Sequence, residues 1–242
     1  IDTTIFRFEG LQAGRDAALR LPLTSASGPC TQLRSDGCSP VVGGLQVQRA
    51  SGEACTTGFV VQHQGANKWI SASHCDATKF TMTGEVFRQA WWATGPLLGQ
   101  EEYDKPGYTC GILFWKCRAS DAARYTVYSG VSSERGLIAR TNDPRGPGQG
   151  SGGATIDWGT PYFIILDVTG VYGTLVGQQV HKVGRATGWT YGSVTHSCID
   201  HISSEGPEPG LWTKINCVDK SDLLAGGGTA ADRCSFACQA AW

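Results

Sequence analysis

From Val41 onward, short runs rich in β-branched and aromatic residues alternate with turn residues such as Gly, Pro, Asn and Asp. Helical periodicity is weak along the whole chain. Short apolar runs between turn signals are typical of a β-sandwich or β-barrel. The pattern therefore predicts an all-β fold, with strands over residues 44–49, 57–62, 68–72, 84–92, 125–128, 162–168, 179–183, 192–198 and 211–217.

Two segments depart from this pattern. Residues 1–40 could hold a short strand over 5–8, two helical turns over 14–21 and a turn-rich stretch over 29–40, so we expect an N-terminal arm or a pro-segment remnant. Residues 141–153 contain two Pro and five Gly and offer little to bury, which favours a crossing between two units. The expected units are 1–40, 41–140, 141–153 and 154–242.

Composition removes several function classes. The 242 residues include 20 Lys and Arg against 21 Asp and Glu, a balance that disfavours a nucleic-acid binder. No apolar run approaches the roughly 20 residues of a membrane span. Ile1 does not open a basic and apolar leader, so we expect that a signal peptide has been removed.

The ten cysteines indicate an oxidising compartment, because disulfides persist there and not in the cytosol. A zinc site is disfavoured because no C-x-x-C pair occurs. We expect a secreted protein, in which Cys30 bridges Cys38 and Cys110 bridges Cys117. Four further cysteines allow three pairings, and the sequence does not choose among them: Cys198, Cys217, Cys234 and Cys238.

His74 stands where an apolar run, Trp69 to Ala72, gives way to small residues and then a Cys. A lone His is more often structural than catalytic. Here, however, the strings Cys-Thr-Thr-Gly-Phe-Val-Val (55–61) and Ile-Ser-Ala-Ser-His-Cys (70–75) resemble the first barrel of chymotrypsin-like serine proteases, closest to the bacterial streptogrisin type. Residues 41–44 (Val-Val-Gly-Gly) and 184–194 (Gly-Arg-Ala-Thr-Gly-Trp-Thr-Tyr-Gly-Ser-Val) resemble other parts of the same family.

This resemblance implies two antiparallel β-barrels, the first over 41–140 and the second, incomplete in this chain, over 154–242. It implies a Cys55–Cys75 disulfide beside the catalytic His, which matches His74. It also implies a secreted endopeptidase that acts on polypeptides by acyl transfer and requires no cofactor or metal.

In the family an Asp follows the His by some tens of residues, at a strand start among small neighbours. Asp121, within Ser-Asp-Ala-Ala, fits best and would orient His74. The rival is Asp104, which lies in a charged stretch that ends in Pro106. That setting favours a solvated turn.

The family places its nucleophile in Gly-Asp-Ser-Gly, and this string is absent from the 242 residues. Ser151, within Gly-Ser-Gly-Gly, lacks the Asp and lies in the crossing, so we interpret it as linker. We expect the Ser just beyond Trp242, on a C-terminal companion segment. A nicked chain, an incomplete sequence and a relative that lost its catalytic tail compete to explain the gap.

Two other functions remain open at this stage. The chain could be a catalytically inactive protease homologue that acts as a binding or scaffold protein. It could also be a Trp-rich binding module, although Trp91, Trp92 and Trp189 are more typical of core and rim than of a sugar platform. The remaining histidines tested for ligand spacing have a structural or solvated interpretation: His181, His196 and His201.

Overall fold

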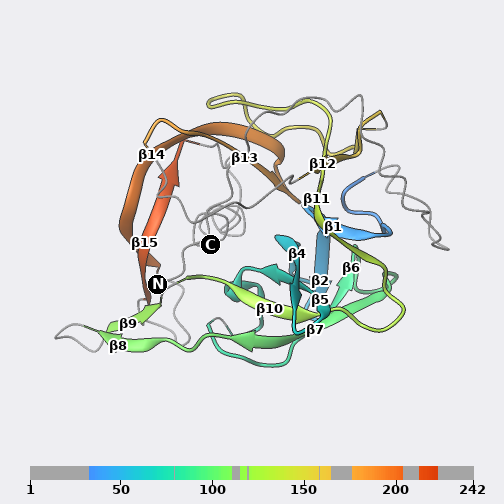
Figure 1. The fold of residues 1–242 in the computed structure, drawn as a ribbon, viewed down its shortest axis with the longest axis horizontal. Helices are drawn as coiled ribbons and strands as arrows, with labels where there is room; N and C mark the ends of the chain where they lie inside the picture. The colour runs from blue at the N-terminus through green and yellow to red at the C-terminus, as the bar shows by residue number, and fades with distance from the viewer. Residues whose placement is uncertain are drawn as a thin grey trace.

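The computed structural model describes residues 33–78, 80–110, 115–118, 120–157, 159–164, 176–203 and 213–222. Within these residues the chain forms fifteen β-strands and one short 3₁₀ helix (Figure 1). The all-β fold class expected from the sequence is therefore confirmed. The elements expected over 5–8 and 14–21 lie outside the described residues.

The strands form three sheets. The seven-stranded sheet has the order β3-β2-β6-β7-β10-β5-β4 and contains Ala54–Thr56, Gln46–Arg49, Val86–Gln89, Leu97–Asp104, Ala123–Thr126, Ala66–Ser71 and Phe59–His63. The five-stranded sheet has the order β13-β14-β15-β9-β8 and contains Gln179–Gly184, Gly188–Ser203, Thr213–Ser221, Trp115–Arg118 and Tyr108–Cys110. The three-stranded sheet has the order β1-β11-β12 and contains Val41–Gly43, Ser133–Ala139 and Tyr162–Ile164.

The seven-stranded sheet must curl strongly. Its two edge strands, β3 and β4, are consecutive in the chain and are joined only by Thr57 and Gly58. The edges of a flat seven-stranded sheet would lie nearly 30 Å apart at about 4.8 Å per strand, whereas this link spans only about 10 Å. The connection therefore brings the two edges together, as a barrel requires.

An aromatic cluster fills the inside of this curled sheet. The Trp69 and Tyr125 rings stack with centroids 4.0 Å apart, and Phe87 meets both edge-on. All three side chains are fully buried. A Cβ atom at Gly99 would lie 1.8 Å from the Thr126 carbonyl oxygen, so only glycine allows β7 to approach β10 here.

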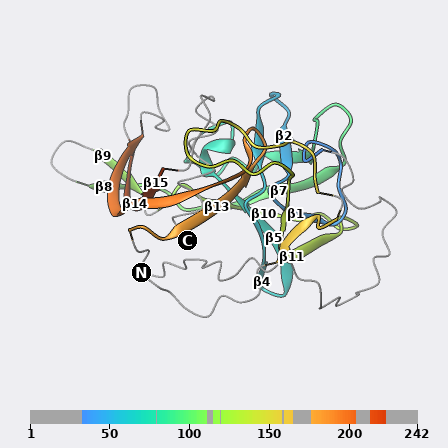
Figure 2. The same ribbon diagram turned by 90° about the horizontal axis from the view of Figure 1, so that it is seen from above.

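The five-stranded sheet lies beside the curled sheet (Figure 1 and Figure 2), with the β8–β9 hairpin below β15 in Figure 1. Strand β9 pairs with β15 in parallel, and every other neighbouring pair in this sheet is antiparallel. Strand β9 ends at Arg118, three residues before Asp121. The chain therefore passes from the five-stranded sheet into the curled sheet immediately before the expected orienting carboxylate.

The observed strands overlap all nine expected ones. The sequence pattern missed β1, β3, β7, β8, β9 and β11. Strand β7, Leu97–Asp104, contains a Gly, a Gln and two Glu, so it lacks the regular alternation that marks a half-buried strand.

The glycine- and proline-rich segment 141–153 is held by the β13–β14 hairpin. Arg145 N–H donates to the Trp189 carbonyl at 3.1 Å, and Tyr191 N–H donates to the Arg145 carbonyl at 2.9 Å. Gly152 N–H donates to the Thr187 carbonyl at 2.7 Å. The segment is thus fixed by its backbone, while the side chain of Ser151 is exposed.

Candidate active site

The ends of three neighbouring strands, β5, β7 and β10, meet at one end of the curled sheet. Ala123, the first residue of β10, pairs with Ser71 at the end of β5 and with Asp104 at the end of β7. Antiparallel pairing places the exit of one strand beside the entry of its neighbour. Residues that follow β5 therefore lie next to residues that precede β10, which brings His74 and Asp121 together from 47 positions apart.

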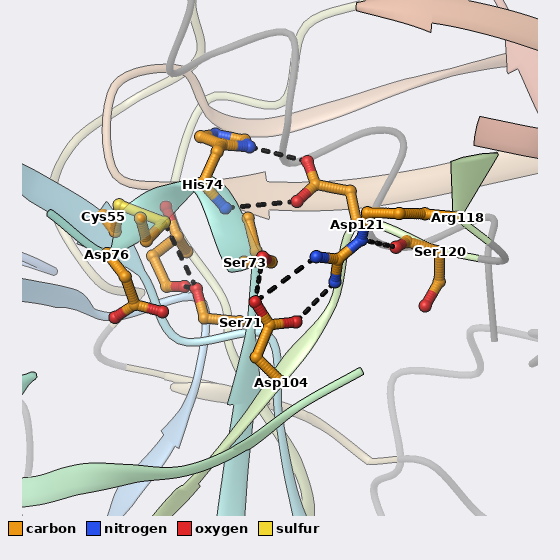
Figure 3. A network of polar contacts seen from close by, with 12 residues as sticks. Cys55, Ser71, Ser73, His74, Asp76, Asp104, Arg118, Ser120 and Asp121 are labelled. Carbon is orange, nitrogen blue, oxygen red and sulfur yellow. Dashed lines mark hydrogen bonds and ion pairs between the residues drawn. A yellow bond between two sulfur atoms is a disulfide. The ribbon is translucent and has the colours of Figure 1, made fainter. Parts of the chain in front are cut away.

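Asp121 holds His74 at two points (Figure 3). Its Oδ2 lies 2.6 Å from His74 Nδ1, and its Oδ1 accepts a hydrogen bond from the His74 backbone N–H at 3.2 Å. Both residues are buried, with exposed fractions of 6% for His74 and 3% for Asp121. A carboxylate in this position fixes the tautomer with the proton on Nδ1 and leaves Nε2 as the basic nitrogen.

A short 3₁₀ helix, η1, carries the histidine. It spans Ser73–Cys75 and is closed by a hydrogen bond from the Cys75 N–H to the Ala72 carbonyl at 3.1 Å. Cys75 bridges Cys55 of β3, which confirms the expected disulfide. With a sequence separation of 20, the chain-entropy model gives this bridge about 3 kcal/mol of stability. The bridge ties the turn of His74 to the barrel wall.

Asp104 is not the solvated turn residue that the sequence analysis expected. It ends β7, and its side chain is fully buried. It forms an ion pair with Arg118 and accepts a hydrogen bond from Ser73 Oγ at 2.7 Å. The expectation was wrong because the residues around Pro106 do not reveal the partner of Asp104. That partner is Arg118, which belongs to β9 of another sheet.

A further buried carboxyl group lies two residues after His74. Tyr125 Oη lies 3.0 Å from Asp76 Oδ2 and 3.3 Å from the Ala72 carbonyl oxygen. Burial and the neighbouring Glu101 carboxylate raise the pKa of Asp76 to about 9, against an ordinary value of 3.8. Glu101 accepts hydrogen bonds from the Thr83 and Gly84 N–H groups at 2.6 and 2.8 Å. With its pKa raised to about 9, Asp76 keeps its proton in the folded protein at neutral pH.

The Asp76→Asn variant should become more stable relative to the wild type as the pH rises. The folded protein keeps the Asp76 proton up to about pH 9, whereas the unfolded chain releases it above pH 3.8. The stability that the wild type gains from the bound Asp76 proton is therefore lost progressively as the pH rises between these two values, whereas Asn cannot ionise. The Tm of the variant minus the Tm of the wild type should rise steadily from about pH 4.5 to about pH 8.5. A difference that stays constant with pH would contradict the assignment.

The cysteine expectations are met where the structure describes both partners. Cys110 bridges Cys117, as expected, across the β8–β9 hairpin. Cys38 and Cys198 each take part in a further disulfide. Residues Cys30, Cys234 and Cys238 lie outside the described residues.

His181, expected to be structural or solvated, lies against Trp189, and His196 Nδ1 lies 3.1 Å from Thr195 Oγ1. Trp189 Nε1 donates to His181 Nδ1 at 3.1 Å, and burial lowers the pKa of this imidazole. Across the described ranges, no group of three or more His, Cys, Asp or Glu side chains could hold a metal ion. Nor does any described helix have the length and apolar character needed to cross a membrane.

No protein-family model matches the chain. No curated protein matches it either.

Solved structures do match. A glutamic acid specific serine protease that uses a histidine triad in substrate binding aligns over 79% of this chain and 76% of its own, with 16% identity and a TM-score of 0.48. An α-lytic protease homologue, N4, aligns over 78% and 76%, with 21% identity and a TM-score of 0.47. A Cellulomonas bogoriensis chymotrypsin aligns over 76% and 71%, with 17% identity and a TM-score of 0.45. The solved structures that this chain is similar to are chymotrypsin-like bacterial serine proteases.

Proposed function

We propose that this protein is a secreted serine endopeptidase in which His74 is the general base and Asp121 orients it. The observation that carries the proposal is the 2.6 Å contact between His74 Nδ1 and Asp121 Oδ2, made by two buried side chains. A buried imidazole held through Nδ1 by a carboxylate is equipped to take a proton at Nε2 and return it later. The protease-like motifs around Cys55 and His74 support the same chemistry.

The reaction proceeds by acyl transfer. The serine hydroxyl attacks the substrate carbonyl carbon while its proton passes to His74 Nε2. The Asp121 carboxylate stabilises the imidazolium that results, and the same proton then passes to the leaving amine as the peptide bond breaks. Water, activated in turn by His74, hydrolyses the acyl-enzyme and regenerates the serine.

The nucleophile belongs to a companion segment that follows Trp242. The string Gly-Asp-Ser-Gly is absent from the 242 residues, and the exposed Ser151 stands in a Gly-rich segment. Catalysis requires a hydroxyl held within about 0.5 Å of its productive position, which favours a serine on a packed turn. The oxyanion hole, made of backbone N–H groups beside the serine, belongs to that segment too.

An oxidising compartment outside the cell suits the disulfides of this protein. The disulfides Cys55–Cys75 and Cys110–Cys117 would not persist in a reducing cytosol. A protease released into an oxidising medium also meets polypeptide substrates outside the cell.

The proposal is tested with the full-length protein and an unfolded reporter polypeptide. Mass spectrometry should identify new peptide termini that accumulate with time and that are absent with the His74→Ala variant. Cleavage at an equal rate by wild type and variant would refute the proposed chemistry. A folded wild type that cleaves nothing would instead favour the inactive protease homologue acting as a binding or scaffold protein.

A further inference from the structure

A second buried network lies behind the His74–Asp121 pair, and the reaction proposed above does not use it. The Arg118 guanidinium and the Asp104 carboxylate face each other with side-chain exposures of 2% and 0%. Arg118 Nη2 pairs with Asp104 Oδ1, and Nη1 lies 3.4 Å from Oδ2, so the pair is forked (Figure 3). The Phe80 ring lies 4.8 Å from the guanidinium carbon.

Each member of this ion pair also holds a neighbour of the proposed catalytic residues. Asp104 Oδ2 accepts the hydrogen bond from Ser73 Oγ at 2.7 Å, and Ser73 directly precedes His74. Arg118 Nε donates to the Ser120 carbonyl at 3.0 Å, and Ser120 directly precedes Asp121. The network therefore joins the two backbone turns that carry His74 and Asp121.

The two halves of the network come from different sheets. Asp104 ends β7 of the curled sheet, whereas Arg118 ends β9, which pairs with β15 of the five-stranded sheet. A buried ion pair does little for net stability compared with apolar residues, because both charges must leave water. Its geometric specificity is the better explanation for its presence at this position.

We infer that Arg118 and Asp104 are positioning residues that set the distance and angle between His74 and Asp121. This inference rests on the proposed peptidase function for its kinetic consequence, although the geometry that it concerns can be measured without catalysis. Arg118 supplies a planar fork with donors in fixed directions, so it can hold Asp104 and the Ser120 carbonyl together. A lysine would retain the charge and lose the second contact.

The substitution Arg118→Lys separates charge from geometry. It leaves Asp104 facing a cation, so the fold should survive, but the Ser120 carbonyl loses its donor. A displacement of about 1 Å in a catalytic group costs roughly 100-fold in rate. We expect kcat to fall between about 10-fold and 100-fold while KM stays within about twofold. The double variant Arg118→Met with Asp104→Asn, which removes both charges, should show the same split.

A second measurement, which does not depend on activity, is the nuclear magnetic resonance chemical shift of the His74 Nδ1 proton in the full-length protein. A short hydrogen bond to a carboxylate moves this proton far downfield, and a change in the bond shifts or broadens the signal. Arg118→Lys should move it. The matched control is Arg124→Met. Arg124 also combines a carboxylate, Glu102, with a ring, Tyr103, but neither partner is next to His74 or Asp121 in the sequence.

The outcomes distinguish this inference from the proposed function. Unchanged kcat and an unchanged proton signal in the folded Arg118 variants would overturn the positioning role, whatever the wild type cleaves. A wild type without peptidase activity, combined with a signal that moves in Arg118→Lys and not in Arg124→Met, would refute the function and support the positioning role. Should the Arg118 variants fail to fold, Ser73→Ala removes only the hydroxyl that joins Asp104 to the His74 turn, and the same two readings decide.

Discussion

Replacing His74 by Ala should lower kcat by about six orders of magnitude, the loss seen when a serine protease is deprived of its general base. Without an imidazole, the serine proton has no acceptor at Nε2 and the leaving amine has no donor. The Asp121 carboxylate would also lose its Nδ1 partner, although the backbone N–H of residue 74 would still donate to Oδ1. The fold should therefore persist at reduced stability.

The measurement is kcat on a peptide reporter, accompanied by thermal unfolding to show that the variant is folded. Adding Asp121→Ala to His74→Ala should cause almost no further loss, because residues that act as a unit are not additive. A second loss as large as that of Asp121→Ala alone would show that Asp121 acts independently of His74.

The second large effect is that of Asp121→Asn, which should lower kcat by roughly four orders of magnitude with the fold nearly intact. The Asn oxygen can still accept from the His74 backbone N–H, as Asp121 Oδ1 does. Its amide nitrogen, however, donates to Nδ1 and so moves the ring proton to Nε2. An imidazole in that tautomer cannot take the serine proton.

The measurement is kcat of Asp121→Asn beside that of a control variant, Asp143→Asn. The control removes an exposed carboxylate that pairs with Arg145. The control should retain activity within about twofold, since exposed ion pairs contribute little. A loss of less than about tenfold in Asp121→Asn would contradict its orienting role.

Local sequence patterns predict several strands of the curled sheet, and the motif resemblance predicts the contact between His74 and Asp121. The strands around Phe59 and Trp69 are short, apolar and bounded by turn residues, so they are recognisable without long-range information. The small neighbours of Asp121 favour it over Asp104 as the orienting residue, and it is Asp121 that contacts the His74 ring. The motif resemblance predicts the bridge between Cys55 and Cys75, and that bridge is confirmed.

The burial of Asp104 could not be predicted in the same way. Its neighbours in sequence, Lys105 and Pro106, indicate an exposed turn. Burial depends on Arg118, which reaches Asp104 only because β9 joins the five-stranded sheet and ends beside β7. Local composition cannot reveal a partner that is brought in by the pairing of distant strands. Asp76, buried beneath Tyr125, escaped prediction for the same reason.

The position of a covalent serine adduct tests the proposed mechanism most directly. The full-length protein would be treated with a fluorophosphonate probe, digested, and mapped by mass spectrometry beside its His74→Ala variant. We expect one adduct, on a serine that follows Trp242, and none in the variant. An adduct on Ser151 that requires His74 would contradict the proposed nucleophile, as would an active protein in which no serine is modified.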